Sequence, residues 1–122
     1  MGQVNSPISV VEHGKLKIIM VTEKVNWDQA KELDQLISDL ITEGATHIVF
    51  NLERVKFLCS AAIGVIACYL KRVREMGGDI YLVTCNEYVD YVLGSVGFEM
   101  LFKGTLFKNK ADFGKFLEVN AK

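Results

Sequence analysis

The sequence predicts a single small α/β domain in which about four helices pack against a mixed, mostly parallel β-sheet. The chain has 122 residues, of which half are hydrophobic and 24% are charged, and this supplies enough apolar surface for one core. Short segments rich in Val and Ile alternate with amphipathic segments. This alternation predicts parallel strands connected by right-handed crossovers. We expect residues 8–118 to form the domain and residues 1–7 to form a short flexible leader.

The chain opens with a hairpin pattern that is followed by an amphipathic helix. Residues 8–12 and 16–21 are rich in β-branched side chains and flank a short turn that contains glycine. Asn26 and Gln29 have the spacing of a capping box, and Gly44 is expected to end the helix that they start. The apolar face of this helix recurs every three or four residues, at Ala30, Leu33, Leu36, Ile37, Leu40 and Ile41.

The rest of the chain alternates between apolar strands and capped helices. Ser60, Asn86 and Asn109 each have a side chain that is typical of a helix N-cap. Glycines at 77–78 and at Gly97 are expected to end the second and third helices. The apolar runs predict strands at residues 47–52, 80–83 and 101–107.

Composition and charge argue against several classes of function. Fourteen basic and fifteen acidic residues leave a net charge of −1, which gives no electrostatic basis for binding nucleic acid or an anionic membrane surface. No apolar run reaches the ~18 residues of a membrane span, and the N-terminus lacks a signal-peptide pattern. The three cysteines lack CxxC spacing and indicate free thiols, so we expect a cytoplasmic protein. Two histidines without spaced carboxylates predict no metal site, and no pattern predicts a cofactor.

The first half of the second helix carries no charge, because no charged residue occurs between Cys59 and Leu70. A helix that covers a small core needs only one apolar stripe, whereas apolar side chains here surround the whole circumference. This half is therefore either buried on all sides or presents an apolar surface to a partner or to a second copy of the chain. We favour partner binding, and the residues that we expect to take part are Asn26, Cys59, Ser60, Ala61, Ala62, Ile63, Val65 and Ile66.

Ser60 offers a hydroxyl at the start of this helix. As an N-cap it would accept a hydrogen bond from a first-turn N–H group, and a capping role alone is the commoner use of such a serine. Helix N-termini also favour anions, through their free N–H groups and the helix dipole. A phosphoserine here would place about −1.5 to −2 charges beside an apolar surface. A docked partner would have to desolvate that charge, so phosphorylation would release the partner and leave the fold intact.

Three motifs occur in order along the chain. They are Cys59-Ser60-Ala61-Ala62-Ile63-Gly64 after a strand, Met76-Gly77-Gly78-Asp79 before an apolar strand, and Val92-Leu93-Gly94-Ser95-Val96-Gly97-Phe98. Together with the order of strands and helices over residues 8–118, these motifs resemble the STAS domain of bacterial anti-sigma factor antagonists. The resemblance implies a regulatory protein rather than an enzyme.

The resemblance also implies a mechanism of signal transduction in the regulation of transcription. In this family the unphosphorylated antagonist binds an anti-sigma factor that is also an ATP-dependent serine kinase, and a sigma factor is thereby freed. Phosphorylation of the signature serine breaks the complex, and a serine phosphatase resets it. Ser60 matches that serine, so the resemblance implies a phosphoprotein that acts by partner switching.

The chain departs from the family pattern at three positions. Cys59 stands where the family has an aspartate, Ala62 where it has a glycine, and Asn26 where many members have an aspartate. A carboxylate beside Ser60 could orient its hydroxyl or interact with the metal–nucleotide end of the kinase, and a thiol does neither well. One alternative is therefore an adaptor that is never phosphorylated, as a subunit of a larger signalling or lipid-transport assembly.

A second alternative, from a different class, is a thiol enzyme that uses Cys59. Thiol pKa values fall near helix N-termini. Neither His13 nor His47 lies in a motif that ties it to Cys59, so this alternative is the least favoured.

Several other residues are expected to have structural roles. Cys68 and Cys85 should be small core residues, and Trp27 should contribute packing. For Arg54 and Lys56, which precede Cys59, we favour a solvated loop over contact with a phosphate or an acidic partner. The apolar group that we expect in the core consists of Phe98, Met100, Leu101 and Phe102.

Overall fold

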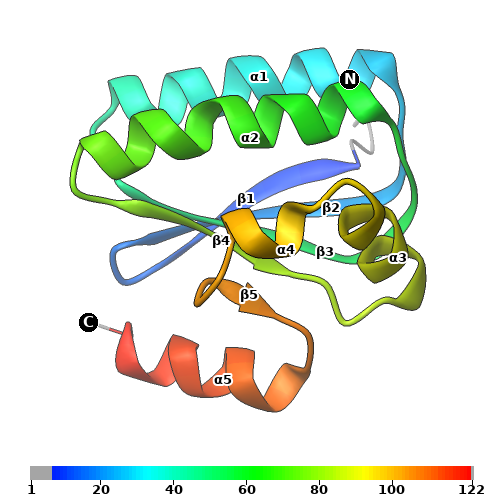
Figure 1. Cartoon of the computed structure of the whole chain (residues 1–122). Helices are drawn as coiled ribbons and strands as arrows, with labels where there is room; N and C mark the ends of the chain where they lie inside the picture. The colour runs from blue at the N-terminus through cyan, green and yellow to red at the C-terminus, as the bar shows by residue number, and fades with distance from the viewer. Residues whose placement is uncertain (1–6, 122) are drawn as a thin grey trace, which may run out of the picture.

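The sheet is mixed and mostly parallel (Figure 1). The computed structural model describes residues 7–121, and over these residues the strands are β1 (Ile8–His13), β2 (Leu16–Val25), β3 (His47–Leu58), β4 (Asp79–Val83) and β5 (Leu106–Phe107). They lie side by side in sequence order, with β1 antiparallel to β2 and the other pairs parallel. The predicted α/β fold and mixed sheet are confirmed.

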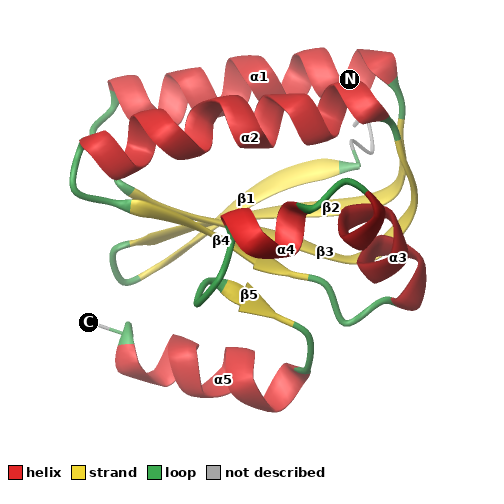
Figure 2. Cartoon of the chain, in the orientation of Figure 1, coloured by secondary structure: helices red, strands yellow, loops and turns green. Residues whose placement is uncertain are grey.

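Helices cover both faces of this sheet (Figure 2). Within the described residues they are α1 (Trp27–Thr42), α2 (Ser60–Glu75), α3 (Glu87–Ser95), α4 (Phe98–Leu101) and α5 (Lys110–Val119). α1 and α2 lie side by side on one face, and α5 lies on the opposite face. The helix starts follow the capping residues: Asn26 N–H donates to Gln29 Oε1 at 2.9 Å, and Asn109 Oδ1 accepts from Asp112 N–H at 2.9 Å.

The central strands are buried on both faces, which explains their continuous apolar runs. Phe50 and Leu82 lie in the larger core beneath α1 and α2, to which α3 and α4 also contribute. Val49 and Val83 point the other way, into a smaller core that α5 closes with Phe113. Alternate residues of one strand therefore serve two separate cores.

The two glycines between α2 and β4 have different functions. Gly77 has φ +85°, a left-handed conformation that side chains disfavour. Gly78 lies against the loop before β3, and a Cβ atom there would stand 1.7 Å from the Thr46 carbonyl oxygen. The neighbouring Asp79 N–H donates to that oxygen at 3.0 Å, so the close approach aligns the starts of β3 and β4.

Two boundaries differ from the prediction. β3 continues to Leu58 rather than ending at residue 52, so Arg54 and Lys56 lie in a strand rather than in a loop. The expected strand at residues 101–107 is replaced by the helical turn α4 and the two-residue β5. Phe98 and Phe102 are four residues apart, and a helical turn places both in the core with ring centroids 5.3 Å apart. The same turn leaves Met100 86% exposed and Leu101 exposed, so their expected core positions are wrong.

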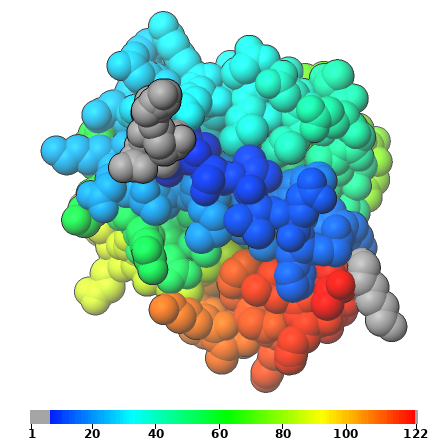
Figure 3. All heavy atoms as spheres, turned by 180° about the vertical axis from the view of Figure 1, so that it is seen from behind, coloured from blue at the N-terminus to red at the C-terminus, as the bar shows by residue number. Residues whose placement is uncertain are grey.

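The two edges of the sheet are β1 and the short β5. Figure 3 shows β1 at the molecular surface between α1 and α5. Pro7, expected to belong to the leader, is tied to the sheet because its carbonyl accepts from Thr22 N–H at 2.9 Å; the rest of the expected leader, residues 1–6, lies outside the described residues. Between residues 7 and 121, no helix has the length and apolar character that crossing a membrane requires.

Candidate functional site

The carboxyl ends of β2 and β3 bring Asn26, Cys59 and Ser60 together. Val25 and Leu58, the last residues of these strands, are register partners. The Cys59 N–H group donates to the Val25 carbonyl oxygen at 3.0 Å, which holds the two loops side by side. In sheets with parallel strands, ligands usually bind at the carboxyl ends of the strands, because the loops there lead into helix N-termini. The structure thus joins three predicted site residues from two separate loops.

Cys59, rather than Ser60, is the N-cap of α2. Its backbone is extended, with φ −78° and ψ 159°, and its carbonyl accepts from the N–H groups of Ala62 and Ile63 at 3.2 and 3.3 Å. The expected capping role of Ser60 is therefore wrong. Pairing with β2 ends at Leu58, so the chain turns into the helix at Cys59 and makes Ser60 the first helical residue.

The Ser60 hydroxyl is exposed, and within residues 7–121 it has no hydrogen-bond partner. It lies at the start of α2, where the first backbone N–H groups have no acceptor within the helix. The first turn of α2 contains no acidic residue. A negative charge on the Ser60 oxygen would therefore meet the positive end of the helix dipole without opposition from its own turn.

Three of the predicted contact residues belong to the core instead of the surface. Ala62 and Ile66 are fully buried and Ile63 is nearly so, because they face the sheet. The prediction that these three residues lie on the contact surface is therefore wrong. Ala61 and Val65 are half-buried and remain partly accessible. The sequence left two alternatives for the uncharged half of α2, complete burial or an accessible apolar surface. The structure combines them, because one side of this half packs in the core and another side is accessible.

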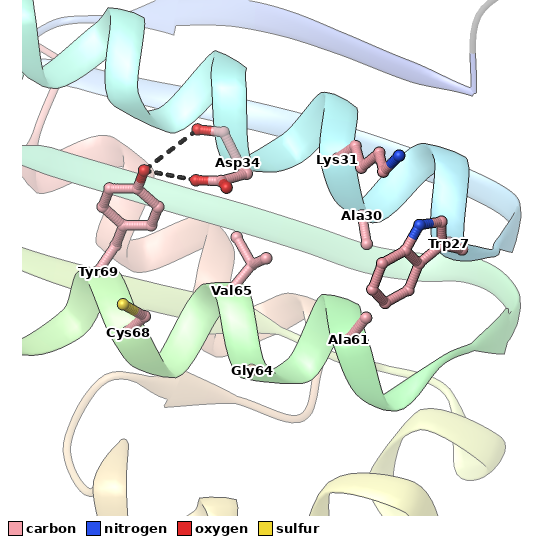
Figure 4. A pocket seen from close by; sticks show the side chains of 9 residues that line it. All are labelled: Trp27, Ala30, Lys31, Asp34, Ala61, Gly64, Val65, Cys68 and Tyr69. Carbon is pink, nitrogen blue, oxygen red and sulfur yellow. Dashed lines mark hydrogen bonds between the residues drawn. The ribbon is translucent and has the colours of Figure 1, made fainter.

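The open side of α2 forms a groove with α1 (Figure 4). The groove has a volume of about 380 Å³, and its lining residues are Trp27, Ala30, Lys31, Asp34, Ala61, Gly64, Val65, Cys68 and Tyr69. Small side chains on α2 leave this space, since Ala61, Gly64 and Cys68 recur at intervals of three and four residues. Cys68 is exposed here, so its expected core position is wrong.

The two ends of the groove differ in character. At the end near Asn26 and Ser60, Trp27 is 62% exposed, and the Lys31 ammonium group lies 5.9 Å from the centroid of its ring. Trp27 is therefore a surface residue and not the packing residue that we expected. At the far end the Tyr69 hydroxyl donates to the Asp34 carboxylate, and this hydrogen bond raises the pKa of Tyr69. The accessible apolar surface is thus concentrated beside Ser60.

Asn86, the N-cap of α3, holds the chain that leads to Ser60, and sequence reasoning missed this function. Asn86 caps α3, as predicted, because its Oδ1 accepts from the N–H groups of Tyr88 and Val89 at 2.9 and 3.3 Å. Its Nδ2 also donates to the carbonyl oxygens of Glu53 and Val55 at 3.1 and 2.7 Å. No local pattern encodes these contacts, because they join segments that are more than thirty residues apart.

Neither histidine lies against the Cys59 thiol. His13 Nε2 lies 2.8 Å from the Leu117 carbonyl oxygen, and His47 Nδ1 lies 2.9 Å from the Thr46 hydroxyl. Burial lowers the pKa of His47 and raises the pKa of the Cys85 thiol. In the described part of the chain, no hydrogen bond joins the Cys59 thiol to a base. Over residues 7–121 no cluster of three or more His, Cys, Asp or Glu side chains could hold a metal ion.

Comparison with known proteins identifies the family. The STAS domain model matches residues 7–113, which is most of the chain. A Thermotoga neapolitana protein named "Putative anti-sigma factor antagonist TM1081 homolog" is 30% identical over 98 residues, which cover 80% of this chain and 85% of the relative. The protein therefore belongs to the STAS domain family.

Solved structures agree with this fold. The unphosphorylated form of the anti-sigma factor antagonist SpoIIAA is 17% identical, covers 88% of this chain and 91% of its own, and superposes with a TM-score of 0.74. The phosphorylated form of SpoIIAA, a Bacillus cell fate determinant, is 16% identical and covers 88% and 95%, with a TM-score of 0.70. At these identities the likeness establishes the fold alone.

Proposed function

We propose that the protein is a bacterial, cytoplasmic anti-sigma factor antagonist that binds its partner through the surface around Ser60. The partner would be an anti-sigma factor that is also a serine kinase, and a serine phosphatase would reverse its action. The observation that carries the proposal is the exposed, unpartnered Ser60 hydroxyl beside an open apolar groove. Family membership and the name of the Thermotoga relative support the class of partner.

The charge of a phosphate explains how such a complex would be switched. The groove end near Ser60 is formed by Trp27, Ala61, Gly64 and Val65, and the charge nearest to this end belongs to Lys31, whose ammonium group lies over the Trp27 ring. A partner that covers this surface would also cover Ser60. A phosphoserine carries about −1.5 to −2 charges, and burying that charge without a paired cation is costly. The start of α2 tolerates the same charge when the partner is absent, so the switch would act on the complex and not on the fold.

Cys59 favours a second candidate function, that of an adaptor that binds without being phosphorylated. Its thiol replaces the family's aspartate immediately before Ser60, and the first turn of α2 supplies no other carboxylate. A kinase would therefore find no acidic group in this turn to orient the Ser60 hydroxyl. The adaptor would use the same surface in a larger signalling or lipid-transport assembly.

Phosphorylation in vitro tests the switch directly. The chain is incubated with each serine-kinase anti-sigma factor of its source organism, Mg²⁺ and ATP, and the intact mass and the modified peptide are measured. We expect one phosphate, located on Ser60, and loss of binding to the same kinase in a pull-down. Ser60→Ala should bind and gain no phosphate.

A matched control separates the switch from the adaptor. Ser9 is an exposed serine on β1, so Ser9→Ala should be phosphorylated as the wild type is. Stable binding to a kinase without any phosphate gain would contradict the switch and support the adaptor. Absence of binding to all of these kinases would contradict both anti-sigma factor antagonism and the proposed partner.

A further inference from the structure

Within residues 7–121, the second half of β3 has no neighbouring strand on one side. β3 pairs with β4 only as far as Asn51, which is the register partner of Val83. On its other side β3 pairs with β2 as far as Leu58. Residues 53–58 therefore present backbone N–H and C=O groups toward α3 with no strand to receive them. Buried backbone groups need partners, so other residues must supply them.

Side chains at the start of α3 take the place of the missing strand. The two Asn86 bonds to the Glu53 and Val55 carbonyl oxygens satisfy the first part of the segment. The Tyr88 hydroxyl accepts from the Leu58 N–H group at 3.0 Å and satisfies the last residue of the strand. We call these three hydrogen bonds, two donated by Asn86 and one accepted by Tyr88, the α3 clamp.

The clamp ends two residues before Ser60. Leu58 is held by Tyr88 on the α3 side, and the next residue, Cys59, is held by the Val25 carbonyl on the β2 side. These two bonds fix the backbone at the point where the chain turns into α2. The backbone that leads into Ser60 is therefore held from both sides of the strand.

We propose that Asn86 and Tyr88 are positioning residues for Ser60, which they hold in the orientation that the kinase needs for phosphoryl transfer. The inference rests on the proposed function and extends it. No carboxylate in the first turn of α2 orients the hydroxyl, so the backbone clamp performs that task. A misplaced nucleophile slows transfer even when the substrate still binds, because transfer depends on alignment with the phosphorus.

Tyr88→Phe removes a single oxygen and is the main test. The matched control is Tyr91→Phe on the same helix, where the tyrosine is 76% exposed and, within residues 7–121, makes no hydrogen bond. Two quantities are measured in each variant: hydrogen exchange at the Leu58 amide, and kcat and KM for phosphorylation of Ser60. Loss of one hydrogen bond should accelerate exchange at Leu58 by about three- to tenfold. We expect kcat to fall by a similar factor with KM nearly unchanged, and the melting temperature to fall by about 2–8 °C, which leaves the domain folded in the assay.

Asn86→Asp provides a second, independent variant. Aspartate keeps the oxygen that caps α3 but replaces the Nδ2 donor with an acceptor that faces the Glu53 and Val55 carbonyls. Its kcat should fall further than that of Tyr88→Phe, while the helical content is kept.

The outcomes distinguish this proposal from the proposed function. Unchanged exchange at Leu58 in Tyr88→Phe, or faster exchange with an unchanged kcat, overturns positioning while Ser60 phosphorylation stands. An equal loss in Tyr91→Phe also overturns it. Absence of phosphate on wild-type Ser60 overturns the proposed switch and this inference together.

Discussion

The two halves of β3 have different surroundings, and the difference separates stability from function within one strand. Residues 48–51 have β2 on one side and β4 on the other, and Ile48, Val49 and Phe50 are completely buried. Among the described residues, β2 is the only strand that pairs with residues 53–58, and Phe57 in this segment is exposed. The first half is buried on both faces, whereas the second half, which we call the arm, leads to Ser60 and places only Val55 and Leu58 in the core. Contacts on the exposed side of the arm can therefore change without disturbing the core.

Truncating one phenylalanine in each half should give the largest contrast. Phe50 is fully buried between the sheet and the helices, so Phe50→Ala should lower the free energy of unfolding by about 3–5 kcal/mol. Phe57 is 43% exposed, and Phe57→Ala should cost less than about 1 kcal/mol. Urea unfolding followed by circular dichroism measures both values. Similar losses in the two variants would contradict the division of β3 into a core half and an arm.

A pair of glycine substitutions should give the next largest contrast. Gly78→Ala places a Cβ atom against the Thr46 backbone where β3 and β4 start, and should cost about 2–3 kcal/mol. Gly64→Ala lies one turn beyond Ser60, where a Cβ atom would meet nothing within 4 Å. It should instead stabilise α2 by about 0.5–1 kcal/mol, because alanine is the better helix former. Thermal unfolding of both variants checks that the two changes in stability have opposite signs. Destabilisation by Gly64→Ala would show that α2 near Ser60 is as tightly packed as the starts of β3 and β4.

The same division explains which parts of the fold could be predicted from the sequence. The capping residues Asn26, Asn86 and Asn109 and the apolar periodicity are local signals, and they located the main helices. The arm was missed because Glu53, Arg54 and Lys56 place three charges in its first four residues, which resembles a solvated loop until the long-range partners are known. Its strand character depends on pairing with β2 and on Asn86, neither of which is local.

The candidate site was predicted in part for a related reason. Ser60 stands at a junction of strand and helix, which a single sequence can reveal. An uncharged helix does not show which of its sides the sheet covers, and so Ile63 and Ile66 were assigned to the surface although they are buried. Trp27 is the reverse case, since only the arrangement of α1 and α2 reveals its exposure.

A charge at Ser60 should change stability by a smaller amount, and in the favourable direction. Ser60→Glu places a carboxylate in the first turn of α2, and we compare it with Ser60→Gln, which has the same shape without the charge. The helix dipole should make the glutamate variant more stable by about 0.3–1 kcal/mol at low salt. The difference should shrink in 1 M salt, where charges are screened within about 3 Å. A less stable glutamate variant would mean that a charge at the end of the arm disturbs the fold, against the proposed switch.

The smallest effect is expected at the far end of the groove, where the titration of Tyr69 reports it. The hydrogen bond to Asp34, followed by burial, raises the pKa of Tyr69 above its ordinary value of 10.0. Because the folded pKa is raised, the protonated tyrosine favours the folded state below pH 10, and this contribution is lost as the pH rises through the folded pKa. Asp34→Asn should move the Tyr69 pKa back toward 10.0, as followed by NMR of labelled tyrosine rings. Tyr81, whose pKa is raised mainly by burial, serves as an internal control and should not change. If Tyr69 titrates identically in both proteins, the Tyr69–Asp34 bond does not hold α1 against α2, and the groove is as open at this end as it is beside Ser60.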